Sequence, residues 1–423
     1  MPPISPRNPK NELAKAIVDH HEKIDAWFLK KFSESPAPFY CSIDIRDSGE
    51  KVAPVDCNLY PAGFNNICEI DLEQAVGIFK DEISKIAGTG PLPSKIGIIP
   101  ENHTENKFYL ENLYHLRSIF EEAGFEVEII RIDGIPEKLT LTTASEKTLL
   151  QHPGRIENGK LCSSSGFVPD WLILNHDYSS GYPKILDEIS QPVLPSHRMG
   201  WHSRKKSTHF RFYNELATEF AALVGIDPWL ISIESEAVGP VNFNDGLGVD
   251  QVADTASRML KRIEEQYLLH SIDRKPALFI KNDSGTYGMG IMVIHSADEL
   301  ISMNRRTKNK MSTGKGKTQI EQVLVQEGIP TQMVTEGSTS EPVIYLMNGH
   351  LIGGFIRANT ERDEMDNLNS QGMFFKKLCF KDLSDCIETK EFDELPLLEA
   401  VYGVIGRLSA LAAACEIRQT LGP

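Results

Sequence analysis

The chain has 423 residues, of which 41% are hydrophobic and 24% are charged, and its formal net charge is −15 at pH 7. A chain of this length exceeds what one hydrophobic core supports, so the sequence predicts two or three domains. The negative charge argues against a nucleic acid as the main partner, because a polyanion would be repelled, but a local basic pocket for a small anion stays open.

The N-terminal residues contain no apolar core of signal-peptide length, and no apolar run approaches the roughly 18 to 20 residues of a membrane span. The seven cysteines form no CxxC pair. Their scatter and odd number favour reduced thiols over a disulfide framework or a zinc site. We therefore expect a soluble, cytoplasmic protein without a membrane partner. The sequence leaves its oligomeric state open, with a homo-oligomer among the alternatives.

The first half of the chain has the hydrophobic pattern of an α/β fold. An amphipathic helix is predicted over residues 11–32. Residues 39–67 start as a strand and continue as an irregular stretch rich in Asp, Asn, Pro and Gly. So long an irregular stretch inside a domain is usually functional or disordered, and its aromatic and aliphatic side chains argue against disorder.

A predicted strand–helix–strand unit follows at residues 95–132, where Asn102 and Glu105 have the spacing of a helix start. Residues 170–177 form a further apolar strand. This alternation predicts a mostly parallel sheet, and hence an N-terminal α/β substrate domain over residues 1–195.

The composition changes near residue 195, where a strongly basic segment leads into a predicted helix. A second amphipathic helix is predicted over residues 250–269, and hairpin-like strands with an Asn-Gly turn follow. Residues 305–319 are basic and polar and are predicted to form a mobile loop. The apolar residues 395–417 predict a buried C-terminal helix.

The stretch FIKNDSGTYGMGIMVI at residues 279–294 places Lys281 at the end of one predicted strand and three glycines before the next. The glycines have the reverse of the dinucleotide-binding spacing and precede a strand instead of a helix. The nearby MSTGKGKT has Met311 where a P-loop requires its first glycine. Both familiar phosphate motifs are therefore excluded.

A glycine-rich loop between two strands suits a flexible flap whose backbone N–H groups close over phosphate oxygens. Lys281 would direct its charge to the same phosphates, with Ser284 and Thr286 as hydroxyl donors. The alternative is a hairpin whose glycines only permit a tight turn, with Lys281 as a solvated charge. The flap glycines are Gly285, Gly288 and Gly290.

Two neighbouring segments favour the nucleotide interpretation. The strand VLVQEGI begins about forty residues after the flap, as an adenine-binding hinge would, with Gln326 and Glu327 as its contacts. Its alternative is a core strand with an exposed Glu327. Upstream, the segment RKKSTHF contains Lys205 and Lys206, either of which could be a second lysine that binds ATP. The alternative is a basic, solvated start of a helix.

This order of elements over residues 200–380 resembles the ATP-grasp superfamily. The resemblance implies an α/β fold in which a pre-ATP-grasp domain precedes an ATP-grasp domain over residues 196–423, with residues 270–330 carrying the flap. It also implies that ATP phosphorylates a carboxylate and that an amine or thiol then attacks the acyl phosphate.

Several unusual strings over residues 36–380 are similar to the proteobacterial type of glutamate–cysteine ligase. They include PVDCNLYPAGFNNI, IPENHTENKFYL, GWHSRKKSTHF, EPVIYLMNGHLIGGFIRAN and DNLNSQGMFF. The resemblance implies that glutamate, cysteine and ATP give γ-glutamylcysteine, ADP and phosphate, the first step of glutathione biosynthesis. Two alternatives stay open: another ATP-grasp carboxylate–amine ligase, and a protein that binds ATP but has lost catalysis.

Such chemistry requires cations and Mg²⁺ around the transferring phosphoryl group. In addition to Lys281, Arg357 is predicted to be catalytic, because its place in the sequence is like that of the arginine that stabilises the acyl phosphate in ATP-grasp ligases. The alternative for Arg357 is a salt bridge at the end of a strand. Mg²⁺ prefers oxygen ligands. The C-terminal segment lacks the Glu-x-Asn triplet of the superfamily, so the predicted ligands are Asp366, Asn367 and Asn369, with Glu341 as an outlying candidate. An Asx-rich turn is the alternative for this loop.

The amino-acid substrates need partners for their carboxylate and ammonium groups. Candidates lie in the irregular N-terminal segment and after the strand that ends near residue 100, where α/β sheets tend to bind ligands. These polar residues are Arg46, Asp56, Asn58, Asn65, Asn66, Glu101, Asn102 and His103. Asn102 has a competing role as a helix cap.

Overall fold

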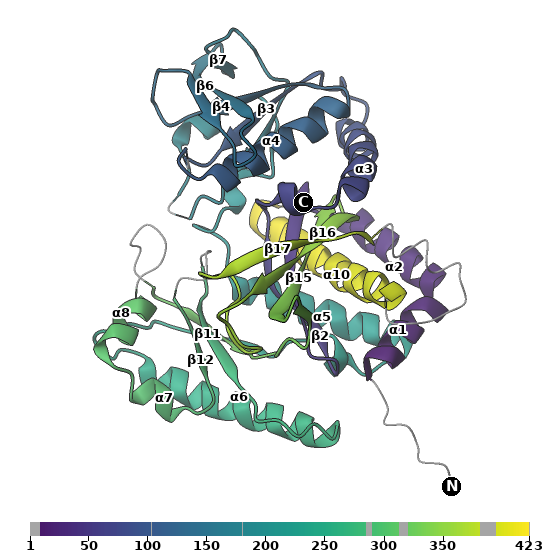
Figure 1. Ribbon diagram of the computed structural model, residues 1–423, viewed down its shortest axis with the longest axis vertical. Coiled ribbons are helices and arrows are strands. Elements are labelled where there is room, and N and C mark those ends of the chain that lie inside the picture. The colour runs from purple at the N-terminus through teal and green to yellow at the C-terminus, as the bar shows by residue number, and fades with distance from the viewer. Residues whose placement is uncertain are drawn as a thin grey trace.

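The computed structural model describes residues 9–102, 104–179, 181–284, 290–312, 320–380 and 395–422, and its strands form three sheets. A mostly parallel sheet lies at one end of the molecule, an antiparallel sheet lies in the middle, and a small antiparallel sheet lies at the other end (Figure 1). The fold is thus mixed α/β, as predicted.

The mostly parallel sheet confirms the strand–helix–strand unit. Its strand order is β5-β6-β4-β3-β8-β9, with β7 paired to β6, and only the pairs that involve β5 or β7 are antiparallel. The bounds are α3 (Glu69–Ala87), β3 (Lys95–Pro100), α4 (Lys107–Glu122), β4 (Glu126–Arg131), β5 (Leu139–Thr142), β6 (Thr148–Glu157), β7 (Lys160–Ser163), β8 (Trp171–Asn175) and β9 (Val193–Leu194).

The start of α4 differs from the prediction. The side chain of Asn106 accepts hydrogen bonds from the backbone N–H groups of Phe108 and Tyr109, both at 3.2 Å. Asn106 is therefore the cap, and Asn102 lies exposed outside the helix. Both asparagines fit an N-cap by residue type, and the packing of the helix against the sheet selects the later one.

Strands from both ends of the chain form the central sheet. Its order is β17-β16-β15-β1-β2, with β14 paired to β15, and all neighbours are antiparallel. A boundary at residue 195 would divide this sheet, because β1 and β2 lie before it and the other strands after it. The bounds are β1 (Tyr40–Asp47), β2 (Val52–Asn58), β14 (Val334–Thr335), β15 (Ser338–Met347), β16 (His350–Asn359) and β17 (Met373–Leu378).

Two local features of this sheet bear on the predictions. Much of the stretch predicted to be irregular is the β1–β2 hairpin, and the isoleucines of β1 alternate with polar residues, as in a strand that has one apolar and one polar face. The predicted Asn-Gly turn is confirmed between β15 and β16, where Asn348 and Gly349 have φ of 47° and 82°. A tight hairpin turn of this kind requires positive φ at both positions.

Helices cover one face of the central sheet. α10 packs on it beside α5, and Ile43, Ile344 and Leu408 share their core (Figure 1). Residues Ala400–Leu421 are long and apolar enough to cross a membrane, but 72% of the apolar 18-residue window within them is buried inside the protein. The predicted buried C-terminal helix is thus confirmed, and the helix predicted over residues 11–32 is two helices. The bounds are α1 (Pro9–Asp19), α2 (His21–Glu34), α5 (Lys206–Val224) and α10 (Leu395–Leu421).

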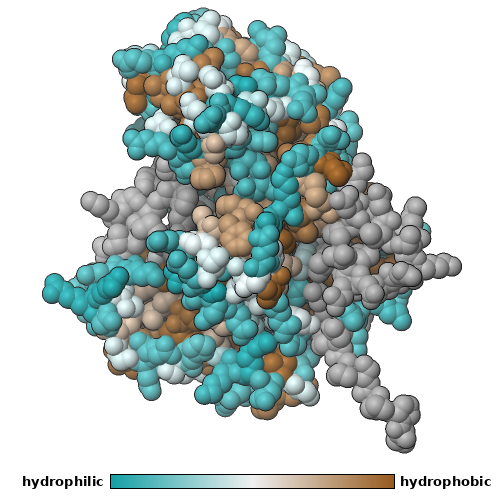
Figure 2. All heavy atoms as spheres, in the orientation of Figure 1, coloured by the Kyte–Doolittle hydropathy of each residue, from teal (hydrophilic) through white to brown (hydrophobic). Residues whose placement is uncertain are grey.

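The small sheet has the order β10-β13-β11-β12, and the amphipathic helix predicted over residues 250–269 is α6, which packs beside it. Part of the predicted mobile loop is the helix α8, which buries Met311 while its hydrophilic side chains cover the left edge of the molecule in Figure 2. The rest of that loop lies outside the described residues. The bounds are β10 (Ser235–Val238), α6 (Val249–Leu269), β11 (Leu278–Asn282), β12 (Ile291–Ile294), α7 (Asp298–Ile301), α8 (Arg305–Ser312) and β13 (Val323–Glu327).

The prediction that the cysteines are reduced is wrong for one pair. Cys68, at the start of α3, and Cys379, just after β17, form a disulfide across 311 residues of sequence. Their spacing in the chain carries no signal, because the two residues meet only when α3 packs beside the central sheet. Among the described residues the free thiols are Cys41, Cys57, Cys162 and Cys415.

Candidate active site

The face of the central sheet that points away from α10 carries a row of charged side chains. Ile43 and Ile45 of β1 lie in the core that α10 shares. Side chains alternate along a strand, so Asp44 and Arg46 point to the opposite face. The alternation of apolar and charged residues over positions 43–46 is therefore the local origin of the row.

Arginines and carboxylates pair closely along this row. Glu341 of β15 lies opposite Arg357 of β16, accepts a hydrogen bond from its Nη1 at 2.9 Å and pairs with Arg46 Nε at 2.6 Å. Arg357 Nη1 also lies 2.8 Å from Asp44 Oδ2. Buried charges persist only when they are paired in this way. Arg357 Nε is buried without a hydrogen-bond partner among the described residues, so this arginine retains a donor.

Two lysines border the charged row. Lys281 Nζ of β11 donates to Gln326 Oε1 at 2.6 Å and to the carbonyl oxygen of Val55 at 3.1 Å. Lys206, the first residue of α5, is buried and donates to the carboxylate of Asp56. Lys205 beside it is exposed, so the inward-facing lysine of the predicted pair is Lys206.

The environment of these lysines suits an anionic ligand. Burial lowers the pKa of Lys281 to about 7; the charges of Lys206 and Arg46 act in the same direction and that of Asp56 opposes them. Burial raises the pKa of the Asp56 carboxyl, but the neighbouring Lys206 ammonium group outweighs it and lowers the pKa overall. Cations held close together against their mutual repulsion are typical of a site that receives phosphates.

The segment after Lys281 is tied to the start of α5. Ser207 donates through its backbone N–H and its hydroxyl to the two carboxylate oxygens of Asp283, both at 2.8 Å. Ser284 Oγ donates to the carbonyl oxygen of Arg204 at 2.9 Å. These bonds fix the two lysine-bearing segments against each other. Of the predicted flap, Ser284 and Gly290 are described, and Gly285, Thr286 and Gly288 lie outside the described residues.

The two predicted adenine contacts have different surroundings. Gln326 belongs to β13, and its Oε1 accepts the hydrogen bond from Lys281 of β11. Its Nε2 is buried without a hydrogen-bond partner among the described residues. The carboxylate of Glu327 is buried, pairs with Lys51 Nζ at 2.7 Å and accepts the backbone N–H of Glu234 at 3.0 Å. Glu327 is therefore not the exposed residue of the alternative interpretation.

The predicted metal ligands lie in a loop at the edge of the charged row. Arg46 Nη2 donates to the carbonyl oxygen of Asp366 at 2.6 Å. Asp366 Oδ2 accepts the N–H of Asp363 at 3.3 Å, and Asn367 Oδ1 accepts the N–H of Asn369 at 3.1 Å. The Asn367 contact is that of an Asx turn, and the Asp366 contact closes the loop back onto Asp363. In the described structure the loop meets Arg46 through its backbone.

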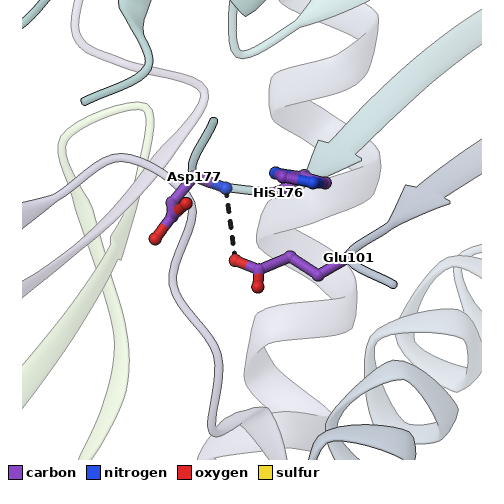
Figure 3. Close-up of side chains that lie close together, drawn as sticks. All are labelled: Glu101, His176 and Asp177. Carbon is purple, nitrogen blue, oxygen red and sulfur yellow. Dashed lines mark hydrogen bonds between the residues drawn. The ribbon is translucent and has the colours of Figure 1, made fainter. Parts of the chain in front are cut away.

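A second polar group, Glu101, His176 and Asp177, lies at the carboxyl ends of β3 and β8 (Figure 3). The two strands are parallel neighbours, so the residues that follow them meet at one edge of the sheet. One ligand atom from each side chain lies within 4.8 Å of the others. Of the predicted residues near this edge, Glu101 belongs to the group, Asn102 is exposed, and His103 lies outside the described residues.

The polar loop after β2 is held next to this second group. Asn112 of α4 accepts the N–H of Gly63 at 2.7 Å, and Asn175 Nδ2 donates to the carbonyl oxygen of Pro61 at 2.7 Å. The predicted residues here make local contacts. Asn58, at the end of β2, accepts the backbone N–H of Tyr60, and Asn65 Nδ2 of the loop donates to Asn66 Oδ1.

Sequence reasoning missed Asp44 and Asp177. Asp177 ends the predicted strand over residues 170–177, so the argument that selected Glu101 could also have selected it. Asp44 lacks such a signal, because its role depends on which strands lie beside β1.

The chain matches the glutamate–cysteine ligase family over residues 14–417. It is also similar to a crystal structure from Methylobacillus flagellatus KT, of a protein provisionally named a γ-glutamylcysteine synthetase. The TM-score is 0.90 at 35% sequence identity, and the match covers 99% of this chain and 98% of that chain.

Two other solved structures have TM-scores too low to carry an argument. D-alanyl-alanine synthetase A from Vibrio cholerae has a TM-score of 0.31 at 13% identity and covers 74% of this chain and 80% of its own. A glutathione synthetase-like effector from Globodera pallida has a TM-score of 0.36 at 10% identity, and the match covers 82% of this chain and 83% of that chain. No curated protein matches. The family match and the Methylobacillus structure together show that the chain belongs to the glutamate–cysteine ligase family.

Proposed function

We propose that this ligase joins the γ-carboxylate of L-glutamate to the amino group of L-cysteine at the charged row of the central sheet, through an acyl phosphate. A γ-carboxylate oxygen attacks the γ-phosphorus of ATP, and ADP leaves. The cysteine nitrogen then attacks the acyl carbon, the phosphate leaves, and the nitrogen loses a proton. The observation that carries the proposal is the meeting of Lys281, Lys206 and Arg357, from three separate elements, at one sheet face.

Each cation has a role that its surroundings support. Lys281 and Lys206 bind the ATP phosphates, which supply the negative charge that this crowded positive site favours. Arg357 is held by Asp44 and Glu341 with its Nε still available. Its planar guanidinium group would steady the acyl phosphate and the charge that develops on the tetrahedral carbon.

The chemistry implies Mg²⁺, and the residues present fit it. Asp44, Asp56 and Glu341 offer carboxylate oxygens beside the phosphate-binding cations, and oxygen is the donor that Mg²⁺ prefers. Bound there, the ion would neutralise charge on the transferring phosphoryl oxygens. The predicted ligands Asp366, Asn367 and Asn369 form the second candidate set, because the side chains of Asp366 and Asn367 already accept backbone N–H groups of their own loop.

The ATP-grasp-like arrangement is part of the proposal. Lys281 belongs to the small sheet and Val55 to the central sheet, and the hydrogen bond from Lys281 Nζ to the carbonyl oxygen of Val55 joins the two sheets. The nucleotide would lie between these sheets under the flap, with its adenine near Gln326 and Glu327. The domain limits of 1–195 and 196–423 stay a prediction.

Release of ADP from Mg-ATP tests the proposal, with amino acids supplied singly and in pairs. Release that requires both glutamate and cysteine, with γ-glutamylcysteine as product, supports it. Release with a different pair would assign another carboxylate–amine ligase, and ATP binding without turnover for any pair would indicate lost catalysis.

A further inference from the structure

The group formed by Glu101, His176 and Asp177 lies outside the charged row and has its own set of contacts. The backbone N–H of Asp177 donates to Glu101 Oε1 at 3.4 Å, and Asp177 Oδ1 accepts the hydroxyl of Ser179 at 2.9 Å. Glu101 and Asp177 are both buried. One carboxylate oxygen of Glu101 and one of Asp177 lie within 4.8 Å of each other, so negative charge is concentrated here and a cation would bind favourably.

The tautomer of His176 argues against a metal ion as that cation. His176 Nδ1 accepts the backbone N–H of Tyr178 at 3.0 Å, so the lone pair of the neutral ring lies on Nδ1 and the hydrogen on Nε2. A metal-bound histidine normally donates from its second nitrogen to such a partner. With that lone pair engaged, the group offers a cation the oxygens of two carboxylates, which accept the hydrogen bonds that an ammonium group donates.

A buried hydroxyl independently points to a ligand at this group. The ring of Tyr178 stacks on His176 with centroids 4.0 Å apart, and its hydroxyl is buried without a hydrogen-bond partner among the described residues. Burial and then the charge of Glu101 raise the pKa of Tyr178, which places the hydroxyl within the field of that carboxylate. Buried polar groups are rarely left unsatisfied, so a ligand that accepts from or donates to this hydroxyl is expected.

One residue joins this group to the phosphate-binding cations. The backbone N–H of Trp201 donates to the carbonyl oxygen of Asp177 at 2.9 Å. The indole ring of the same residue has Lys206 Nζ 4.3 Å from its centroid and the Arg204 guanidinium carbon 4.6 Å from it. A substrate with one end at Glu101 and Asp177 could therefore extend toward the lysines.

We propose that Glu101 and Asp177 bind the α-ammonium group of the glutamate substrate, and that the Tyr178 hydroxyl completes its hydrogen bonds. This assignment rests on the proposed function, since it places the γ-carboxylate toward Lys206 and Lys281. Glutamate suits the site better than cysteine, because the glutamate ammonium group stays charged throughout the reaction. The cysteine nitrogen must lose its charge to attack, and two carboxylates would hold it protonated.

The test compares Glu101→Gln and Asp177→Asn with the wild type, using glutarate as a probe that has the γ-carboxylate of glutamate but no ammonium group. Each variant should raise the KM for glutamate by about tenfold or more, because a charge-assisted hydrogen bond is lost. The KM for cysteine should stay within about twofold. The preference for glutamate over glutarate in kcat/KM should fall by about the same factor as the glutamate KM rises.

Two controls keep the result interpretable. Glu105→Gln removes an exposed carboxylate from the same loop and should change neither constant. Tyr178→Phe removes a hydroxyl that has no hydrogen-bond partner in the described part of the chain, so the thermal stability should not fall, while the glutamate preference should drop severalfold. Calorimetric titration of glutamate and of glutarate into each variant without cysteine gives the same comparison independently of turnover.

Three outcomes would overturn the inference. These are an unchanged glutamate preference in both carboxylate variants, a rise confined to the KM for cysteine, and stoichiometric Mn²⁺ binding that Glu101→Gln abolishes. If the wild type fails to ligate glutamate and cysteine, the proposed function fails. If the wild type ligates them and the variants keep its preference, only this inference fails.

Discussion

Asp44 and Asp56 lie directly opposite each other on the β1–β2 hairpin. Like charges at paired positions repel, and burial raises the pKa of Asp44 although Arg357 opposes the rise. Each carboxylate has its own cation, Arg357 for Asp44 and Lys206 for Asp56. The pair therefore fixes two cations from distant parts of the chain at neighbouring positions, where one phosphoryl group could contact both.

The two adjacent lysines at the start of α5 form a matched pair. Lys206→Ala removes the buried lysine beside Asp56 and should lower kcat/KM for ATP by about a hundredfold or more. Lys205→Ala removes an exposed lysine and should change it less than about twofold. Steady-state ADP release with glutamate and cysteine measures both. Equal losses in the two variants would contradict the assignment of Lys206.

ATP binding should be coupled to proton uptake by Lys281. Its pKa is about 7 without a ligand, and phosphate charge would raise it. Above pH 7 the lysine is mostly neutral and should take up a proton when ATP binds, whereas well below pH 7 it is already charged. Calorimetry at pH 8 in buffers of different ionisation enthalpy measures this uptake. Lys281→Met should abolish it, and buffer-independent heats for the wild type would contradict the prediction.

Arg357→Lys keeps the charge beside Asp44 and Glu341 but removes the planar fork and the Nε donor, which has no hydrogen-bond partner among the residues that the structure describes. We expect kcat to fall by about a hundredfold while the KM for ATP changes little, because the guanidinium group would act on the acyl phosphate and not on the bound nucleotide. Arg258→Lys, at an exposed ion pair, is the matched control. A variant with normal kcat would leave Arg357 with a structural role only.

Glu416 of α10 joins α5 through a buried ion network. It accepts from Arg204 Nε and Nη2, each at 3.0 Å, and lies 2.6 Å from His209 Nδ1. Glu416→Gln removes the buried carboxylate that pairs with Arg204 and should lower the free energy of unfolding by about 3–5 kcal/mol at pH 7. Glu215→Gln, in an exposed pair with Arg211, should cost less than about 1 kcal/mol. Urea unfolding compares the two.

The same ion network should make the free energy of unfolding depend on pH in the acidic range. Burial raises the pKa of Glu416, but Arg204 and His209 outweigh it and lower the pKa to about 2. A glutamate in the unfolded chain has a pKa of about 4.3, so the contribution to stability is complete above that pH and is lost as the pH falls toward 2. The free energy of unfolding of Glu416→Gln should therefore decline less steeply than that of the wild type below pH 4.3. Parallel slopes would contradict this.

The disulfide should contribute measurably to stability. Cys68→Ser should lower the free energy of unfolding by about 2–5 kcal/mol, because the crosslink restricts the unfolded chain. Cys415→Ser, at a free and partly exposed thiol, is the control. Thermal unfolding with and without reductant checks the result. A wild-type Tm that does not respond to reductant would contradict the prediction.

The sequence by itself determined many of the elements and the candidate cations. Hydrophobic periodicity identified β3, β4 and β8, the hairpins after residue 270 and the apolar C-terminal helix, because these patterns depend on near neighbours in the chain. It missed the β1–β2 hairpin. The position of Lys281 between an apolar strand and a glycine-rich stretch was also a local signal. Unusual strings such as GWHSRKKSTHF indicated the family for the same reason.

The tertiary structure alone decided which side chains meet. β1 pairs with β15 some three hundred residues away, and this pairing brings Asp44 and Arg46 to Glu341 and Arg357. Which of Lys205 and Lys206 faces the site likewise depends on how α5 is oriented against β2. Partners of this kind depend on strand register and helix packing between distant segments, which no local pattern encodes.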